Sequence, residues 1–210
     1  MKIDAIMAQA PVIPVLVIED GIDPVALAEA LVAGGLPVIE VTLRTPNALD
    51  AIRAMSRVTG AIVGAGTVRD EAQLARALDA GARFIVSPGL THPLALAARD
   101  TEVPFLPGVA TPSDILRGLD LGLAYFKFFP AEAMGGLATL QALAGPFPEV
   151  RFCPTGGIRA ETAALWLAHP SVLCVGGSWI VPPGERDMAA ITQRARATAA
   201  ALRRSPVPTG

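Results

Sequence analysis

The sequence predicts an α/β protein, and within that class a single-domain (β/α)8 barrel with a short N-terminal helix. Eight apolar, strand-like runs alternate with segments of helical period. Most runs are continuously apolar, which is typical of parallel strands covered by helices. Polar or glycine-rich residues follow nearly every run, as at the active end of a barrel. The 210 residues are close to the lower size limit of such a barrel, and an open doubly wound sheet is the alternative.

The expected elements alternate strictly after a helix in the first seven residues. Strands are expected at 12–18, 38–43, 61–65, 84–87, 104–106, 124–128, 150–153 and 172–175. Helices are expected at 24–33, 46–57, 71–80, 93–99, 112–121, 137–144, 160–168 and 187–204. A capping residue before a proline marks three of the helix starts, at Asp23-Pro24, Thr45-Pro46 and Thr111-Pro112. Glycines mark three of the helix ends, at Gly34, Gly81 and Gly122.

The composition indicates one compact domain over residues 1–204, with a loose tail at 205–210. Hydrophobic residues make up 52% of the chain, and the net charge is −2 with arginines spread along it. This spread argues against nucleic acid or a membrane surface as a partner. The first seven residues contain an early acid and no long apolar run, so we expect a helix, no signal peptide and a cytoplasmic protein. Cys153 and Cys174 are expected to be reduced core residues.

One lysine stands inside an apolar strand. Lysine occurs only twice among 17 basic residues, and Lys127 lies in the run Ala-Tyr-Phe-Lys-Phe-Phe-Pro at 124–130. Burial favours the neutral amine, which is a nucleophile toward carbonyl carbon, whereas arginine cannot do this chemistry. The alternatives are a lysine that extends to the surface from the strand end or one that pairs with a buried carboxylate.

The second strand carries a glutamate in an apolar segment. A charged Glu40 among Val38, Ile39 and Val41 is costly unless it is paired or functional. A carboxylate facing the lumen near Lys127 could transfer protons. The alternative is a structural ion pair with Arg44 or Lys127.

Glycine pairs follow the last two expected strands, at Gly156-Gly157 and Gly176-Gly177. In barrels this is the usual place for a phosphate, because backbone N–H groups and a helix N-terminus can approach its oxygens. Ser178 can add a hydroxyl. Each pair is expected to open onto a turn and a helix.

Other chemistries have little support. Gly64-Ala65-Gly66 has Arg69 where a dinucleotide fingerprint needs a third glycine. The two histidines form no metal-binding pattern, so we predict no metal site, and no nucleophile elbow is present. Thr67 beside Arg44 suits a small carboxylate, with solvated salt bridging as the alternative for the arginine.

Six segments in order resemble the 2-keto-3-deoxy-6-phosphogluconate (KDPG) and 4-hydroxy-2-oxoglutarate (KHG) aldolase family, nearly from end to end. They are Glu-Val-Thr-Leu-Arg-Thr at 40–45, Gly-Ala-Gly-Thr-Val at 64–68, Ser-Pro-Gly at 87–89, Phe-Lys-Phe-Phe-Pro-Ala-Glu at 126–132, Cys-Pro-Thr-Gly-Gly-Ile at 153–158 and Val-Gly-Gly-Ser-Trp at 175–179.

The resemblance implies a class I aldolase in which Lys127 forms the Schiff base and Glu40 relays protons. It implies further contacts to a phosphorylated keto-acid substrate, and it implies a homotrimer that needs no cofactor. In the family pattern, Arg44 and Thr67 would hold the pyruvyl carboxylate, and Pro88 and Phe129 would form the apolar wall. The phosphate would be held by Gly156, Gly157, Gly177 and Ser178. Thr155 matches the form found in gluconate-type enzymes.

Two rival hypotheses remain at this point. One is a phosphosugar isomerase or epimerase on the same barrel, with Glu40 as base and Lys127 as its electrostatic partner. The other is a non-catalytic phosphosugar-binding protein. Only the aldolase needs an amine at position 127, set among Phe126, Phe128 and Phe129.

Overall fold

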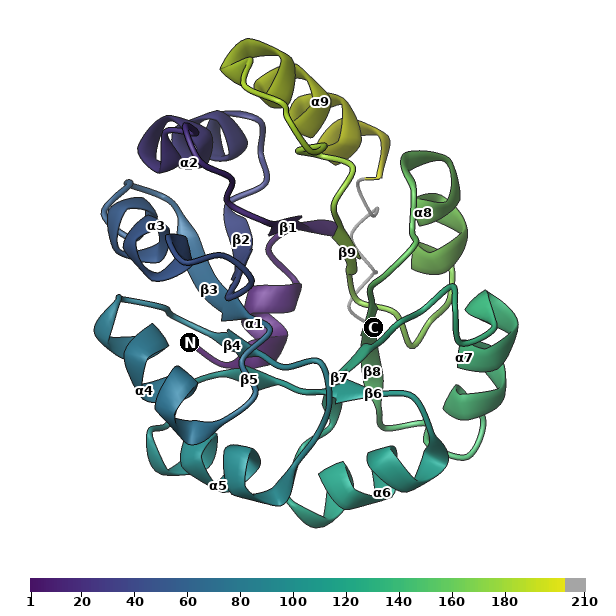
Figure 1. Cartoon of the computed structure of the whole chain (residues 1–210). Helices are drawn as coiled ribbons and strands as arrows, with labels where there is room; N and C mark the ends of the chain where they lie inside the picture. Colours follow the sequence, from purple (N-terminus) through teal and green to yellow (C-terminus); the bar gives the residue numbers. More distant parts are fainter. Residues whose placement is uncertain (203–210) are drawn as a thin grey trace.

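The structure, a computed structural model, describes residues 1–202 as an α/β domain with a curled parallel sheet inside and helices outside (Figure 1). The strands are β1 (Val12–Leu16), β2 (Val38–Thr42), β3 (Ile62–Gly66), β4 (Ile85–Val86), β5 (Phe105–Leu106), β6 (Gly108–Val109), β7 (Tyr125–Phe128), β8 (Arg151–Pro154) and β9 (Val175–Gly177). The helices are α1 (Ile3–Met7), α2 (Pro24–Ala33), α3 (Ala48–Met55), α4 (Glu71–Asp79), α5 (His92–Asp100), α6 (Pro112–Asp120), α7 (Gly136–Ala144), α8 (Ala160–Leu167) and α9 (Met188–Ala201). The tail predicted at 205–210 lies outside the described residues.

The strand order contradicts the open doubly wound alternative. Six strands form one sheet in the order β5-β4-β3-β2-β1-β9, and three form another in the order β6-β7-β8. All pairings are parallel, and β1 lies between β2 and the last strand, β9. A doubly wound sheet would instead reverse its strand order on either side of β1.

The two sheets meet at two places. At the first, β5 and β6 follow each other directly in the chain and are separated by Pro107, whose nitrogen cannot donate to a ladder. At the second, isolated parallel bridges join Phe152 to Val172 and Thr155 to Gly176. The single strand predicted at 104–106 is therefore two short strands, and the strand predicted at 172–175 begins only at Val175.

Helix α1 packs inside the curl of the sheet, at the end where the strands begin. Ile6 and Met7 are buried there in an inner cluster with side chains from six of the strands, together with Phe84 and Cys174. Figure 1 shows α1 across the centre of the ring of strands. Both cysteines are buried in the core, as predicted. A larger cluster lies between the strands and the outer helices.

Two of the three predicted helix starts are confirmed. The Asp23 carboxylate accepts hydrogen bonds from the N–H groups of Val25 and Ala26, and Thr111 forms a capping box with Asp114. The third is wrong, because α3 begins at Ala48 after a turn that occupies Thr45 and Pro46. A tight turn immediately after β2, in which Arg44 N donates to Thr42 O at 2.8 Å, delays the helix.

No helix within residues 1–202 is long and apolar enough to cross a membrane.

Candidate active site

A cavity of about 470 Å³ lies at the carboxyl ends of the strands. It is lined by nine of the predicted site residues, Arg44, Thr67, Pro88, Lys127, Phe129, Thr155, Gly156, Gly157 and Ser178. Glu40 lies beside it, in contact with Lys127. The strand ends thus bring together residues that are far apart in the sequence, as expected for parallel strands.

Lys127 lies in the middle of the sheet and points into the cavity. It is opposite Gly108 of β6 and Cys153 of β8 in the strand register, and it is 5% exposed. Its Nζ donates a hydrogen bond to Glu40 Oε1 at 3.2 Å and lies 5.0 Å from the centroid of the Phe129 ring. The alternative in which Lys127 extends to the surface is therefore wrong, and the pairing with a buried carboxylate is correct.

The predicted apolar surroundings of Lys127 need a correction. Phe126 and Phe128 point to the opposite face of β7, because successive side chains of a strand alternate. Phe126 packs against Gly118 of α6, and the Phe128 ring lies 6.3 Å from that of Trp166 in α8. Only Phe129 of the three is beside the amine.

Glu40 is 3% exposed and pairs with Lys127, so the alternative pair with Arg44 is wrong. The carboxylate fits because β3 carries Gly66 two residues beyond Gly64, the register partner of Glu40. A Cβ on Gly66 would overlap the Glu40 carboxyl group. This close approach explains why Gly66 lacks a side chain.

Arg44 and Thr67 lie at the rim of the cavity. The Arg44 guanidinium forms no salt bridge with any residue from 1 to 202, so it remains available to an anionic group. Thr67 has φ of 59°, a left-handed conformation that costs a β-branched residue about 1–3 kcal/mol. Strain of this kind at a cavity indicates that the position of the side chain matters there.

The glycine pairs behave differently from each other. Gly156 and Gly157 both have positive φ, 103° and 83°, and they line the cavity just before α8. In β9 it is Gly176 that lines the cavity, whereas Gly177 faces Trp179 on the other side of the strand. The predicted contact of Gly177 with the phosphate stays a prediction, since a contact through its N–H group does not depend on where a side chain would point. A loop over residues 178–187 separates this pair from the expected helix, which is α9.

Four lining residues were not among the predicted site residues: Val15, Thr42, Ile158 and Gly176. Strand alternation could have found two of them. Thr42 lies two residues after Glu40 on the same face, and its hydroxyl donates to Leu16 O at 2.8 Å. Gly176 lies next to the predicted Gly177.

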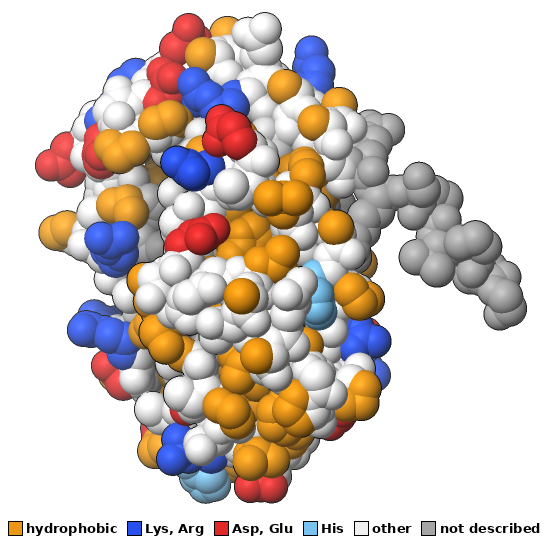
Figure 2. All heavy atoms as spheres, turned by 90° about the vertical axis from the view of Figure 1, so that its right-hand side faces the viewer, with side chains coloured by type: hydrophobic (Ala, Val, Ile, Leu, Met, Phe, Trp, Pro, Cys, Tyr) orange, Lys and Arg blue, Asp and Glu red, His pale blue; other side chains and the backbone are white. Residues whose placement is uncertain are grey.

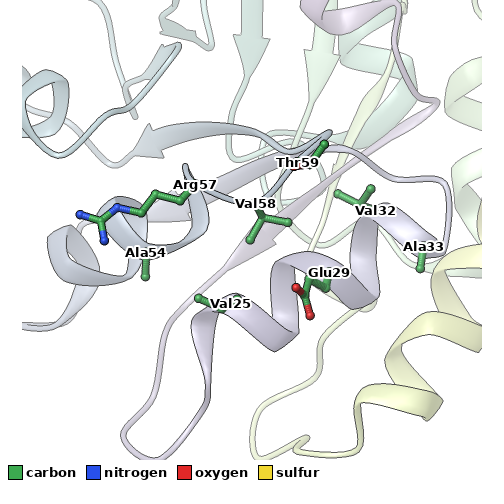
Figure 3. Close-up of a pocket in the computed structure, with 8 residues that line it drawn as sticks. All are labelled: Val25, Glu29, Val32, Ala33, Ala54, Arg57, Val58 and Thr59. Atoms are coloured by element: carbon green, nitrogen blue, oxygen red, sulfur yellow. The ribbon is translucent and has the colours of Figure 1, made fainter.

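A second cavity of about 490 Å³ lies between α2 and α3 on the outside of the domain, but it lacks converging polar groups. Figure 3 shows Glu29 and Arg57 pointing away from each other there, among small apolar side chains. Size alone therefore does not identify the functional site. Within residues 1–202, no group of three His, Cys, Asp or Glu side chains could hold a metal ion.

A buried lysine paired with a carboxylate, in a cavity at the carboxyl ends of parallel strands, defines an α/β enzyme whose reactive group is an amine. The comparison with known families identifies it further. The family model described as KDPG and KHG aldolase matches residues 3–194, and the chain belongs to this family.

Three relatives illustrate the similarity. One is the 2-keto-3-deoxy-6-phosphogluconate aldolase of Zymomonas mobilis, whose structure contains 3-phosphoglycerate. Its sequence is 56% identical, the match covers 98% of each chain, and the TM-score is 0.94. The KHG/KDPG aldolase of Escherichia coli is 55% identical over 85% of this chain and 84% of that protein. The KDPG aldolase of Legionella pneumophila, with pyruvate captured as a covalent carbinolamine, is 45% identical, covers 95% of this chain and 98% of the other, and has a TM-score of 0.91.

Proposed function

We propose that this chain is a class I aldolase that cleaves 2-keto-3-deoxy-6-phosphogluconate into pyruvate and D-glyceraldehyde 3-phosphate. The same site would cleave 4-hydroxy-2-oxoglutarate into pyruvate and glyoxylate, because the pyruvyl half is shared. The observation that carries the proposal is the buried pair of Lys127 and Glu40, with Nζ and Oε1 at 3.2 Å, facing a cavity large enough for a phosphorylated keto acid.

Lys127 supplies the nucleophile. Glu40 accepts a proton from the ammonium, and the neutral amine attacks the C2 ketone to give a carbinolamine. Glu40 returns its proton to the carbinolamine hydroxyl, which leaves as water and gives an iminium ion that withdraws electrons from the C3–C4 bond. The pyruvate-derived carbinolamine in the Legionella pneumophila relative supports this step.

Glu40 is the proton relay. It accepts the proton of the C4 hydroxyl, directly or through a water, as the C3–C4 bond breaks and the aldehyde leaves. The remaining enamine is protonated at C3, and hydrolysis of the resulting iminium releases pyruvate and regenerates the amine of Lys127. Because the side chains of Lys127 and Glu40 are both buried in contact with each other, a proton can pass directly between them.

The rest of the cavity binds the two ends of the substrate. Arg44 and Thr67 bind the pyruvyl carboxylate, since a free guanidinium and a hydroxyl lie together at the rim. Pro88 and Phe129 form the apolar wall beside the pyruvyl carbons. The phosphate binds where the glycine backbones and the Ser178 hydroxyl supply donors. These donors come from Gly156, Gly157, Gly177 and Ser178. Thr155, directly before Gly156, also lines the cavity.

We also infer that the two sheets are parts of one closed (β/α)8 barrel. The bridges between β8 and β9, and the direct continuation of β5 into β6, support closure. Counting β5 and β6 as one interrupted strand gives the eight strands that the fold requires.

The homotrimer is likewise a proposal. Figure 2 shows hydrophobic side chains gathered on the side of the molecule where α7 and α8 lie. Leu165 of α8 and Met134, just before α7, are exposed large hydrophobic residues. A face of this kind suits contact with another copy of the chain. The cytoplasmic location stays a prediction.

The proposal is tested by incubating the protein with 2-keto-3-deoxy-6-phosphogluconate and measuring both pyruvate and glyceraldehyde 3-phosphate. Equal amounts of the two products are expected, and Lys127→Arg should abolish their formation because its guanidinium cannot form the Schiff base. An isomerase or a binding protein would release neither product. Folded protein that gives no cleavage would overturn the proposal.

A further inference from the structure

The loop between β9 and α9, residues 178–187, carries Ser178 at the cavity, and two carboxylates fasten it to its surroundings. The first is Glu19, which follows β1. Its Oε2 accepts hydrogen bonds from Gly184 N at 3.2 Å and from Arg186 Nη2 at 3.1 Å. Arg186 Nη2 also donates to Asp20 O at 3.2 Å. These three bonds tie the loop to the segment after β1.

The second carboxylate, Glu185, ties the same loop to α9. It accepts from Asp187 N at 2.9 Å and from Arg194 Nη2 at 3.1 Å. Arg194 Nη1 also donates to Ile180 O at 2.8 Å. The Glu185 bonds therefore tie the loop to α9, while the Glu19 bonds tie it to the segment after β1.

A hollow of about 360 Å³ lies between the segment after β1 and the later part of the loop, whereas Ile180 near the start of the loop is fully buried in the core. Apolar side chains line it from both segments, Val17 and Ile22 after β1, and Val181 and Pro182 in the loop. The hollow shares Arg44 and Ser178 with the catalytic cavity. The bonds of Glu19 act on Gly184 and Arg186, in the part of the loop that borders this hollow.

We propose that Glu19 and Arg186 act as positioning residues, which hold the loop so that Ser178 and the neighbouring backbone N–H groups face the phosphate of the substrate. This inference rests on the proposed function and assigns the preference for a phosphorylated keto acid to this pair. Lys127 and Glu40 lie on β7 and β2 and form their hydrogen bond and salt bridge with each other, so we expect the pair of Glu19 and Arg186 to affect the phosphate end of the substrate and not the amine chemistry.

The test compares two substrates of the same enzyme. Glu19→Gln and Arg186→Ala are expected to raise KM for 2-keto-3-deoxy-6-phosphogluconate about tenfold, the loss expected for one charge-assisted hydrogen bond. Cleavage of unphosphorylated 4-hydroxy-2-oxoglutarate should keep its kcat and KM within about twofold. The double variant should resemble either single variant, because both substitutions break the same contact. Exchange of the pyruvate methyl protons in D2O is a further phosphate-free measure of the amine chemistry.

Asp79→Asn is the matched control, since it removes a carboxylate from an exposed pair with Arg53 on the outer helices, at 3.6 Å. It should change neither substrate's constants. The inference is overturned if the Glu19 and Arg186 variants leave KM for the phosphorylated substrate unchanged. It is also overturned if they weaken both substrates and methyl exchange equally, which would indicate a general structural role. Wild-type protein that cleaves neither substrate and exchanges no methyl protons would instead contradict the proposed function.

Discussion

The two ends of the sheet differ in what fills them. At the end where the strands begin, α1 closes the interior with Ile6 and Met7, and the surrounding side chains are almost all apolar. At the end where the strands finish, glycines, charged groups and short loops surround a cavity. The same strands therefore supply stability at one end and chemistry at the other. Substitutions at the two ends should have separable effects on the two properties.

The largest effect is expected at the chemical end, from Glu40→Gln. The amide keeps the size of the side chain but cannot accept the proton, so kcat for cleavage should fall about 10²- to 10⁴-fold while the protein remains folded. Steady-state kinetics and a thermal melt measure the two properties. Glu29→Gln, in the outer cavity between α2 and α3, is the control and should retain full activity. A kcat of Glu40→Gln within about twofold of wild type would show that Glu40 only neutralises Lys127.

At the closed end, Met7→Ala should do the reverse. Met7 is fully buried, and its truncation leaves a cavity that costs about 2–5 kcal/mol of unfolding free energy. Urea denaturation measures this loss. Activity per folded molecule should stay within about twofold of wild type. Leu116→Ala, at a position that is 53% exposed on α6, serves as the control with little loss of stability. A large drop in the kcat of folded Met7→Ala would mean that the two ends are coupled.

A smaller effect tests whether the chemical end also contributes to stability. The Asp23 carboxylate accepts two N–H groups at the start of α2, which lies on the cavity side of the domain. Asp23→Ala should lower the unfolding free energy by about 1 kcal/mol. Asn47 stands at the same position of α3 but makes no capping hydrogen bond, so Asn47→Ala should cost less in the same urea experiment. Equal losses would argue against a specific cap at Asp23.

The smallest expected effect is a loss of stability at acidic pH that comes from Glu185. The N–H of Asp187, and then the side chain of Arg194, lower the pKa of Glu185 below its ordinary value of 4.5. The folded state then binds this proton less readily than the unfolded state, so the contribution of Glu185 is present above pH 4.5 and is lost as the pH falls below it. The stability difference between wild type and Glu185→Gln should therefore stay nearly constant from pH 6 to about pH 4.5 and shrink as the pH falls further.

Urea midpoints across this range measure the difference. Glu149→Gln removes a charge from an exposed side chain that has no hydrogen bond or salt bridge within residues 1–202, and it controls for net charge. A difference between wild type and Glu185→Gln that stays constant with pH would contradict the role of these hydrogen bonds.

The order of the elements could be predicted from the sequence because it depends on local patterns. Apolar runs, helix caps and glycines at helix ends gave α2 its observed bounds and placed Lys127 and Glu40 in strands. The family resemblance then assigned roles to residues at the strand ends.

Contacts that depend on three-dimensional proximity could not be predicted in this way. The direction of Phe126 and Phe128 follows from alternation and could have been foreseen, but the delayed start of α3 depends on the turn after β2. The bond between Arg186 and Glu19 joins residues 167 positions apart. No local pattern in either segment indicates the other, so the contact between Glu19 and the loop at residues 178–187 could be found only in the structure.

The central claim is that Lys127, alone among the two lysines of the chain, forms a covalent bond with the substrate. The most direct test is the intact mass of the protein after incubation with pyruvate and borohydride, which reduces a Schiff base to a stable amine. Lys2 stands beside α1 at the closed end, so Lys2→Arg is the matched control for Lys127→Arg. The account predicts a reduced pyruvyl adduct on wild type and on Lys2→Arg, and none on Lys127→Arg. An adduct on Lys127→Arg, or none on folded wild type, would contradict it.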